Sequence, residues 1–281
     1  MELHVFLAVL AAAMMHSGWN AVVKGGTDPF TSVTQVSLFS GSIAFCLLPL
    51  VSVPAAAEVW LWLAASAAIH TLYRFMLIGA YRAGDMTQVY PIMRGAAPLM
   101  TAVATALLIG ERVSDVGFAA IAALSLGVFL MSLRGGRIGG FEKRAVAMAL
   151  LSAACTCGYT LTDGIGARAN GSGPGYALWM FVLNALTMQV IAIAMRGRKA
   201  YDGLRTHWPL MAGGGVMSMI AYFIVIWAMT QAPIALVAAL RETSVLFGAL
   251  IAIIVLKEVL TVWRAVASAF VLLGMLLLKM A

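Results

Sequence analysis

Long runs of apolar residues, each about as long as a membrane is thick, recur along the whole chain. A helix needs about 20 apolar residues to cross the hydrocarbon core of a bilayer, and runs of this length are too long for buried strands. The pattern predicts ten spanning helices, over residues 3–23, 30–52, 59–80, 86–109, 113–133, 145–166, 175–195, 208–230, 234–256 and 261–279. We therefore expect an all-α integral membrane protein with ten transmembrane helices.

Composition supports this class and excludes most others. Of the 281 residues, 63% are hydrophobic and 10% are charged, whereas a soluble domain has about 45–50% apolar and about 25% charged residues. The predicted connections are too short for a soluble domain, so a soluble active site is excluded. The first run follows Glu2 rather than a Lys/Arg cluster and is interpreted as a permanent span, not a cleaved signal peptide.

The basic residues are distributed unevenly between the two predicted faces of the membrane. One face receives twelve, namely Lys24, Arg82, Arg134, Arg137, Lys143, Arg144, Arg196, Arg198, Lys199, Arg205, Lys257 and Arg264, and the other receives Arg112, Arg168 and Lys279. Because cytoplasmic loops are enriched in Lys and Arg, we expect the first face to be cytoplasmic and both termini to lie outside. The net charge of +7 is thereby explained without a nucleic-acid partner.

An internal repeat relates the two halves of the chain. At an offset of 147 residues, 94–133 aligns without a gap on 241–280, and the alignment pairs Arg94 with Arg241, Glu111 with Glu258 and Gly127 with Gly274. A weaker match at an offset of 140 sets Gly18-Trp19-Asn20 over Gly158-Tyr159-Thr160. We predict one five-helix repeat in 1–135 and a second in 141–281. Because five is odd, the second repeat is inverted in the membrane, as in many transporters.

Two stretches resemble a known family. Residues 81–132, with YRAGDMTQVYPIMRGAAPLMTAVATALLIGERVSD, and residues 227–278, with WAMTQAPIALVAALRETSVLFGALIAIIVLKEVLT, are similar to the two EamA-type repeats of the drug/metabolite transporter (DMT) superfamily. The shared pattern is a helix ending in Gly110-Glu111-Arg112, or here Lys257-Glu258-Val259, followed by a closing helix with an internal glycine. Because the second copy departs from Gly-Glu-Arg, no role is carried over to Arg112.

The resemblance implies a function as well as a fold. It implies a secondary transporter in a bacterial-type inner membrane that exports small metabolites by alternating access of the two inverted repeats. The most similar members are bacterial exporters of amino acids, particularly aromatic ones; exporters of other small solutes or drugs are the alternative within the superfamily. The expected partners are a small-molecule substrate and the lipid bilayer, and a monomer is compatible with this function.

Charged residues inside the predicted spans form a short list of candidates for substrate binding, because an uncompensated charge there costs at least about 2.5–3.5 kcal/mol. Arg94 and Arg241 are repeat-related, and a guanidinium group binds a carboxylate with two parallel hydrogen bonds. The alternative is that each arginine caps carbonyls or pairs with an acid to hold the bundle together. Asp163 and Glu242 are candidates for an ammonium group or a coupling proton, although Asp163 lies near a span end and is open to solvation there.

Histidine and aromatic side chains complete the candidate site. His70 lies near the middle of the third span, where imidazole serves either as a proton carrier or as a neutral hydrogen-bonding group between helices. Trp19, Tyr90, Tyr159 and Tyr222 lie inside spans and could line a cavity for a flat or apolar side chain. Packing against lipid or other helices is the alternative for each ring.

Two other function classes compete with a carrier. An integral-membrane enzyme acting on lipid-linked substrates would need a catalytic cluster, and the four scattered histidines supply none. A passive channel is the third class. No cofactor or metal is expected, and the sequence contains no nucleotide-binding Gly-x-x-x-x-Gly-Lys-Ser/Thr loop. Pro91 and Pro98 are expected to interrupt the fourth span on either side of Arg94.

Overall fold

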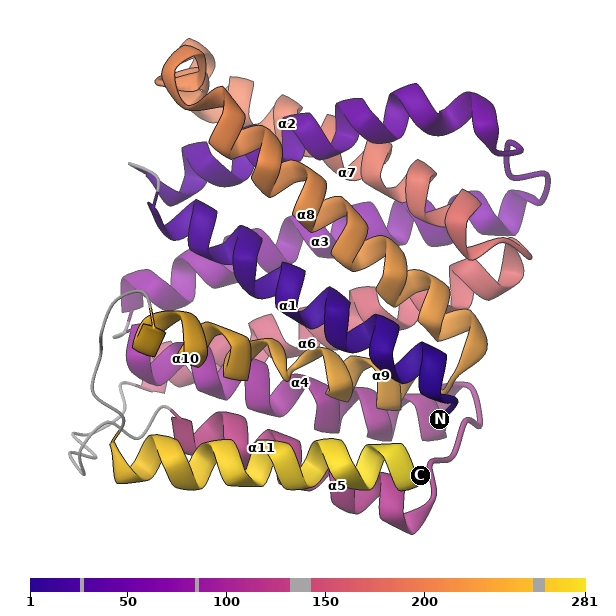
Figure 1. The fold of residues 1–281 in the computed structure, drawn as a ribbon. Helices are drawn as coiled ribbons and strands as arrows, with labels where there is room; N and C mark the ends of the chain where they lie inside the picture. Colours follow the sequence, from indigo (N-terminus) through magenta and orange to yellow (C-terminus); the bar gives the residue numbers. More distant parts are fainter. Residues whose placement is uncertain (26–27, 84–85, 132–142, 255–260) are drawn as a thin grey trace.

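The computed structural model describes residues 1–25, 28–83, 86–131, 143–254 and 261–281, and every regular element within these ranges is helical. The α-helices are α1 (Leu3–Gly25), α2 (Pro29–Leu47), α3 (Ala57–Ala83), α4 (Met86–Leu108), α5 (Asp115–Met131), α6 (Lys143–Ala169), α7 (Gly173–Arg196), α8 (Leu204–Gln231), α9 (Ile234–Arg241), α10 (Ser244–Ile254) and α11 (Val262–Met280). Short 3-10 helices, η1 (Leu48–Leu50) and η2 (Gly197–Tyr201), follow α2 and α7. The helices run back and forth through one bundle, and both termini lie at the same end (Figure 1).

Several helices are long and apolar enough to cross a membrane. Within the described residues there are six, over Leu3–Val23, Pro29–Leu50, Lys143–Ala169, Gly173–Tyr201, Leu204–Gln231 and Val262–Met280. The outer surface of the bundle carries large apolar side chains; Leu61, Leu107 and Val190, for example, are 71%, 78% and 67% exposed. A surface with so many exposed apolar side chains is suited to contact with lipid.

Local sequence signals determine where two of the helices begin. The side chain of Asp28 accepts the backbone N–H of Thr31 at 2.8 Å, and Pro29 occupies the first position of α2. At the start of α7, Ser172 Oγ accepts the backbone N–H of Gly175 at 3.1 Å. Each capping oxygen satisfies an N–H that the first helical turn leaves unpaired, whereas proline has no N–H to satisfy.

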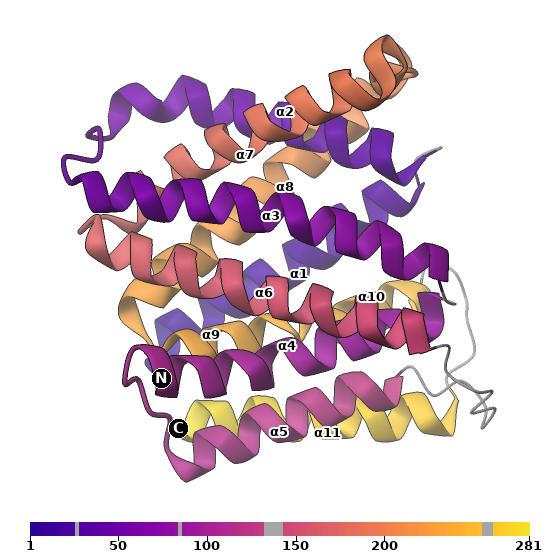
Figure 2. The same cartoon turned by 180° about the vertical axis from the view of Figure 1, so that it is seen from behind.

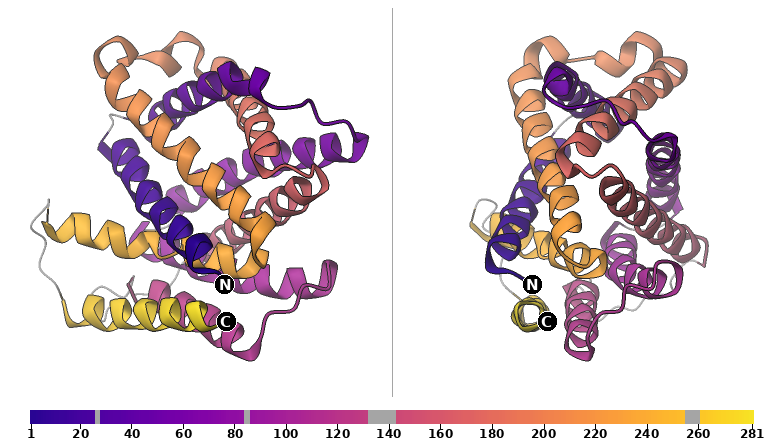
Figure 3. Two further views of the ribbon diagram at one scale, coloured as in Figure 1. Left: turned by 45° about the vertical axis from the view of Figure 1, so that its right-hand side comes forward. Right: turned by 90° about the vertical axis from the view of Figure 1, so that its right-hand side faces the viewer.

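Helices α5 and α11 cross with their backbones in close contact, and two glycines make this approach feasible. A Cβ atom on Gly127 would lie 2.6 Å from Val271 Cγ2 and 2.8 Å from the Val271 nitrogen. A Cβ atom on Gly274 would lie 2.6 Å from Leu124 Cγ and 2.8 Å from the Leu124 nitrogen. Gly127 and Gly274 are related by the 147-residue offset, as are Leu124 and Val271. The end-on view in Figure 3 shows the two helices side by side.

The remaining helices pack around α6 and α8. Helix α3 lies along α6, as seen in Figure 2, and α1 lies along α8. A cluster of buried apolar side chains between α1, α5, α8, α9 and α11 includes Val9, Leu124, Val225 and Leu240. A second cluster between α2, α3, α7 and α8 includes Leu63, Tyr176 and Ile226. Buried polar side chains lie between these two clusters and form the candidate site.

The ninth predicted span is divided into two helices, so the prediction of one continuous helix over 234–256 is wrong. Helix α9 ends at Arg241 and α10 begins at Ser244. Between them the hydrogen bonds span three residues instead of the four of an α-helix. The N–H of Glu242 bonds to the Ala239 carbonyl at 3.0 Å, and Thr243 Oγ1 donates to the Leu240 carbonyl at 2.7 Å. By contrast, α4 is continuous from Met86 to Leu108, so the interruption expected from its prolines does not occur.

Candidate functional site

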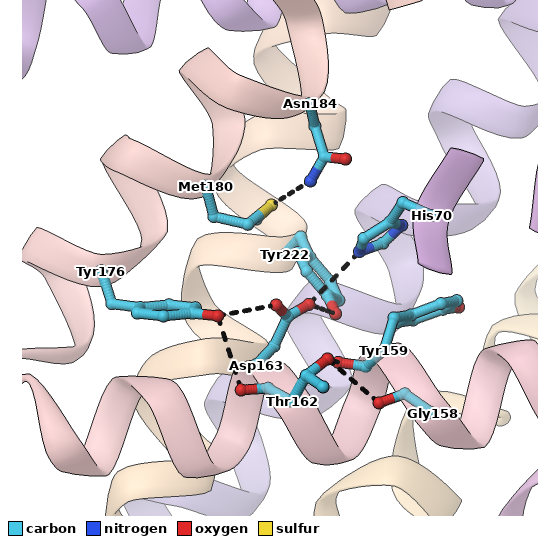
Figure 4. Close-up of polar contacts among 9 residues, drawn as sticks. All are labelled: His70, Gly158, Tyr159, Thr162, Asp163, Tyr176, Met180, Asn184 and Tyr222. Carbon is cyan, nitrogen blue, oxygen red and sulfur yellow. Dashed lines mark hydrogen bonds and ion pairs between the residues drawn. The ribbon is translucent and has the colours of Figure 1, made fainter. Parts of the chain in front are cut away.

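A buried carboxylate is the centre of the first polar cluster. Asp163, on α6, is 0% exposed, so it is not solvated at a helix end. Its Oδ1 accepts a hydrogen bond from the Tyr176 hydroxyl at 3.2 Å, and its Oδ2 accepts one from the Tyr222 hydroxyl at 2.6 Å. His70 Nε2 lies 3.2 Å from the same Oδ2 (Figure 4). Helices α3, α6, α7 and α8 therefore each contribute one polar group to a buried site.

Aromatic rings cover this carboxylate. The His70 ring stacks on Tyr159 with 4.1 Å between centroids and 17° between planes. Tyr222 approaches His70 and Tyr159 edge-on, at 6.0 Å and 6.4 Å. The Tyr73 ring lies 5.7 Å from that of Tyr159, at 78° between planes. Stacked and edge-on arrangements of this kind are the ones that aromatic rings prefer.

The second polar cluster is formed around Arg94, which is 7% exposed on α4. Its Nε lies 2.9 Å from Glu242 Oε2, and its Nη2 donates to Ser244 Oγ at 3.1 Å. The same Nη2 lies 3.3 Å from His16 Nε2, while Trp19 Nε1 donates to His16 Nδ1 at 3.2 Å. A neutral imidazole has only one acceptor nitrogen, so His16 satisfies one of these two donors. Arg94 is thus held by groups from α1 and from the α9–α10 break.

Arg241, the repeat-related arginine, is much less well paired. It is 3% exposed, and its shortest ion pair is 3.9 Å long, from Nη2 to Glu242 Oε1. Its Nε makes no hydrogen bond within the described part of the chain. The guanidinium carbon lies 5.9 Å from the centroid of Tyr159 and 5.8 Å from that of Tyr222. These distances are within the range of cation–π attraction, and they join Arg241 to the aromatic rings around Asp163.

The structure thus brings most of the residues predicted from sequence into two adjoining clusters. His70, Tyr159, Asp163, Tyr222 and Arg241 lie in one. Arg94 and Glu242 lie in the other, with Trp19 attached through His16. The backbone of Tyr90 is in α4, but its side chain is outside the described residues, as are Lys257, Glu258 and Val259 of the second EamA-like pattern.

His16, Tyr73, Tyr176 and Ser244 also belong to the clusters and were not among the site residues predicted from sequence. Tyr176 lies near the start of α7, where a tyrosine is typical of the membrane interface, yet it is 0% exposed. It reaches Asp163 because α6 and α7 are joined by a short turn and run antiparallel. Counting residues outward from that turn would have placed Tyr176 close to Asp163. Ser244 gave no signal of its own, because a serine in an apolar helix is usually a small packing residue.

The ends of three helices that carry site residues are tied together on the side where the termini lie. At the end of α6, Arg168 donates from Nε to the Met229 carbonyl at 2.8 Å and from Nη2 to the Ala232 carbonyl at 3.0 Å. Arg168 Nη2 also contacts Glu111 Oε1 at 3.1 Å. Glu111 Oε2 accepts the backbone N–H of Ile234, at the start of α9, at 3.2 Å. This terminal network therefore joins α6, which carries Asp163, to α8 and α9.

The side chains of the two clusters are of types suited to binding a polar solute. Within the described ranges there is no cluster of three His, Cys, Asp or Glu side chains that could hold a metal ion. The buried charged side chains of those ranges are Arg94, Asp163, Arg241 and Glu242, two of each sign. Opposite charges flanking aromatic rings are complementary to a small polar solute with an apolar part.

Comparison with known proteins supports a membrane transporter. No curated protein matches the chain. A crystal structure of a protein with 18% sequence identity superimposes with a TM-score of 0.82, covering 100% of this chain and 98% of the other, so the two share a fold. Residues 143–280 match the EamA-like transporter family. The second half of the chain is therefore similar to EamA-like transporter domains, and it contains four of the six described helices that are long and apolar enough to cross a membrane.

Proposed function

We propose that the protein is a secondary transporter that exports small zwitterionic metabolites, foremost amino acids with aromatic or apolar side chains. The observation that carries this proposal is Arg241, a buried guanidinium. Within the described part of the chain its Nε makes no hydrogen bond, and its one ion pair is 3.9 Å long. Leaving a buried charge so weakly compensated is costly. A substrate carboxylate would supply the missing hydrogen bonds in the bidentate geometry that arginine favours.

The surroundings of Arg241 fit the rest of an amino acid. Tyr159 and Tyr222 lie beside the guanidinium, and in the proposed complex they pack against the aromatic or apolar side chain of the substrate. Tyr222 also donates to Asp163, so a carboxylate of opposite charge lies at the hydroxyl of one of these rings. We propose that Arg241 holds the carboxylate and that Asp163, with His70, faces the ammonium group. Tyr90 and Trp19 are proposed as further lining residues.

Alternating access of two inverted halves is the proposed mechanism. In the predicted repeat, α1 corresponds to α6 and α3 corresponds to α8. The contact between α1 and α8 in one repeat order therefore corresponds to the contact between α6 and α3 in the other. Both pairs of helices are closely packed in the structure. The contacts of Gly127 and Gly274 between α5 and α11 likewise correspond to each other under the repeat. This packing supports two halves that exchange their conformations.

The test is flux in liposomes containing the purified protein. We expect efflux of at least one aromatic or apolar amino acid, accelerated by unlabelled substrate on the opposite side, as in a carrier and not a channel. Arg241→Gln should abolish this flux, whereas Arg198→Gln, which removes an exposed arginine in η2, should leave it unchanged. A panel of amino acids, nucleobases and cationic drugs, measured with and without a pH gradient, extends the assay. Flux of drugs alone, or none at all, would refute the proposed substrate class.

A further inference from the structure

We propose that Glu242 limits accepted substrates to those with one carboxylate. It neutralises Arg94 and leaves Arg241 available to a single carboxylate, so that solutes with a second carboxylate are excluded. This inference rests on the proposed function, since it takes Arg241 as the carboxylate anchor. It assigns to Glu242 a role in selectivity that is exerted through the two arginines rather than by contact with the substrate.

The two arginines share Glu242 unequally. Glu242 Oε2 lies 2.9 Å from Arg94 Nε, whereas Glu242 Oε1 lies 3.9 Å from Arg241 Nη2. Arg94 has further contacts with Ser244 and His16, and Arg241 faces aromatic rings instead. Glu242 is 2% exposed, so water does not screen this arrangement. One positive charge is therefore balanced within the protein, and the other is left for a ligand.

This carboxylate occurs in only one of the two repeats. At the 147-residue offset, the counterpart of Glu242 is Gly95. A Cβ atom on Gly95 would lie 3.0 Å from the Ser125 carbonyl oxygen of α5, so the first repeat has little room for a side chain here. In the second repeat the helix is broken at this position, and the break places Glu242 against Arg94 of the other repeat. The duplicated arginines thus acquire different roles through one unduplicated acid.

The charge balance predicts which solutes are accepted. Besides the partly buried Arg74, the buried charged side chains of the described residues are two positive and two negative, and a zwitterion with one carboxylate leaves the net charge unchanged. A second ionised carboxylate on the substrate would be an uncompensated negative charge near Glu242 and Asp163. An unpaired buried charge is strongly unfavourable. Because Glu242 already pairs with Arg94, a second carboxylate finds no arginine to bind, and dicarboxylic amino acids are selected against.

Competition by isosteric amino acids tests this inference. Uptake into liposomes of the labelled amino acid that the wild type transports best is measured at pH 7 with unlabelled glutamine or glutamate, or asparagine or aspartate, added on the same side as the label. Within each pair, the two competitors differ in shape by little and in charge by one. In the wild type we expect the neutral member to compete at least about tenfold better than the acidic one. Equal competition by both members in the wild type would overturn the proposal without any variant.

Three variants separate charge from shape. Glu242→Gln should reduce the preference for the neutral competitor at least about tenfold, and Glu242→Asp, which keeps the charge, should retain it. The double variant with Arg94→Gln and Glu242→Gln restores the charge balance and should recover the wild-type preference, which a purely structural role of Glu242 would not do. A folded Glu242→Gln variant with unchanged preference would overturn the inference while leaving the proposed function intact. If the wild type transports no amino acid, the proposed function fails, and this inference fails with it.

Discussion

Replacing Arg168 with methionine should destabilise the protein by removing the centre of the terminal network. The methionine keeps much of the aliphatic length but loses the hydrogen bonds to the Met229 and Ala232 carbonyls and the contact with Glu111. A hydrogen bond involving a charged group contributes about 1.5–3 kcal/mol when buried. The Arg168 side chain is 36% exposed, so water recovers part of each bond. We therefore expect a loss of about 2–4 kcal/mol in the free energy of unfolding.

A double-mutant cycle divides this loss between the backbone contacts and the ion pair. The exposed ion pair with Glu111 should contribute no more than about 1 kcal/mol, so the coupling energy between Arg168→Met and Glu111→Gln should be of that size. Most of the effect of Arg168→Met should persist in the Glu111→Gln background, because the two carbonyls remain without a donor.

The measurement is denaturant-induced unfolding of the detergent-solubilised protein, followed by circular dichroism or tryptophan fluorescence. Arg198→Gln is the matched control, since it removes an exposed arginine from η2 and should change the free energy of unfolding by less than about 0.5 kcal/mol. A loss of less than about 1 kcal/mol for Arg168→Met would show that the hydrogen bonds to the helix ends are replaced by solvent, and would refute the reasoning.

Three further predictions concern the packing of α5 against α11, the buried carboxylate of Asp163, and the pairing of Asp28 with Arg196 at the start of α2. Gly127→Ala should lower the free energy of unfolding by about 1–3 kcal/mol, because the added Cβ would meet backbone atoms of α11. Gly213→Ala is the control and should not destabilise the protein, because its Cβ would have no atom within 4 Å. Chemical denaturation compares the two variants. Tyr222→Phe deletes the 2.6 Å hydrogen bond to the buried carboxylate and should cost about 1–3 kcal/mol in the same assay. At the start of α2, burial raises the pKa of Asp28, but hydrogen bonds from Arg196 and the capped backbone N–H outweigh it, so this pKa lies below its ordinary value. A lowered carboxyl pKa stabilises the fold at pH values above the unfolded pKa of about 3.9. This stabilisation is lost as the pH falls through the folded pKa. The gap in unfolding free energy between wild type and Asp28→Asn should therefore be under about 1 kcal/mol near pH 6, because the pair is partly exposed, and should vanish in acid; a pH-independent gap would contradict this.

The positions of most helices could be predicted because the membrane imposes a simple rule on the sequence. A helix that spans lipid must be apolar over most of its length, so a run of apolar residues and a helix coincide. The run predicted over 175–195, for example, corresponds to α7 at Gly173–Arg196. The break between α9 and α10 could not be predicted, because no proline or glycine marks it. It depends on Thr243 bonding to the Leu240 carbonyl and on Arg94 attracting Glu242, and both are properties of the folded chain.

Residue type identified candidates for the site but not their contacts. Buried charges in a membrane protein are rare and costly, so Arg94, Asp163, Arg241 and Glu242 could be selected from sequence. Their partners depend on the relative rotation and tilt of helices, which periodicity does not specify. Tyr176 illustrates this limit: it lies near a helix end, where interfacial exposure is usual, yet the α6–α7 turn directs it onto Asp163.

The contact between α5 and α11 bears on where movement is accommodated during transport. Gly127 and Gly274 bring the two helices so close that any sliding would force Val271 or Leu124 into the opposite backbone. Packed interfaces of this kind resist continuous deformation. Because each helix contributes the same kind of contact, the interface stays the same when the two proposed halves exchange conformations. We therefore expect α5 and α11 to move as a unit, so that a disulfide engineered between them leaves flux unchanged. In the proposed alternating-access mechanism, we expect the change of access to be confined to the helices around Asp163 and Arg241, whose ends the terminal network joins on one side of the bundle.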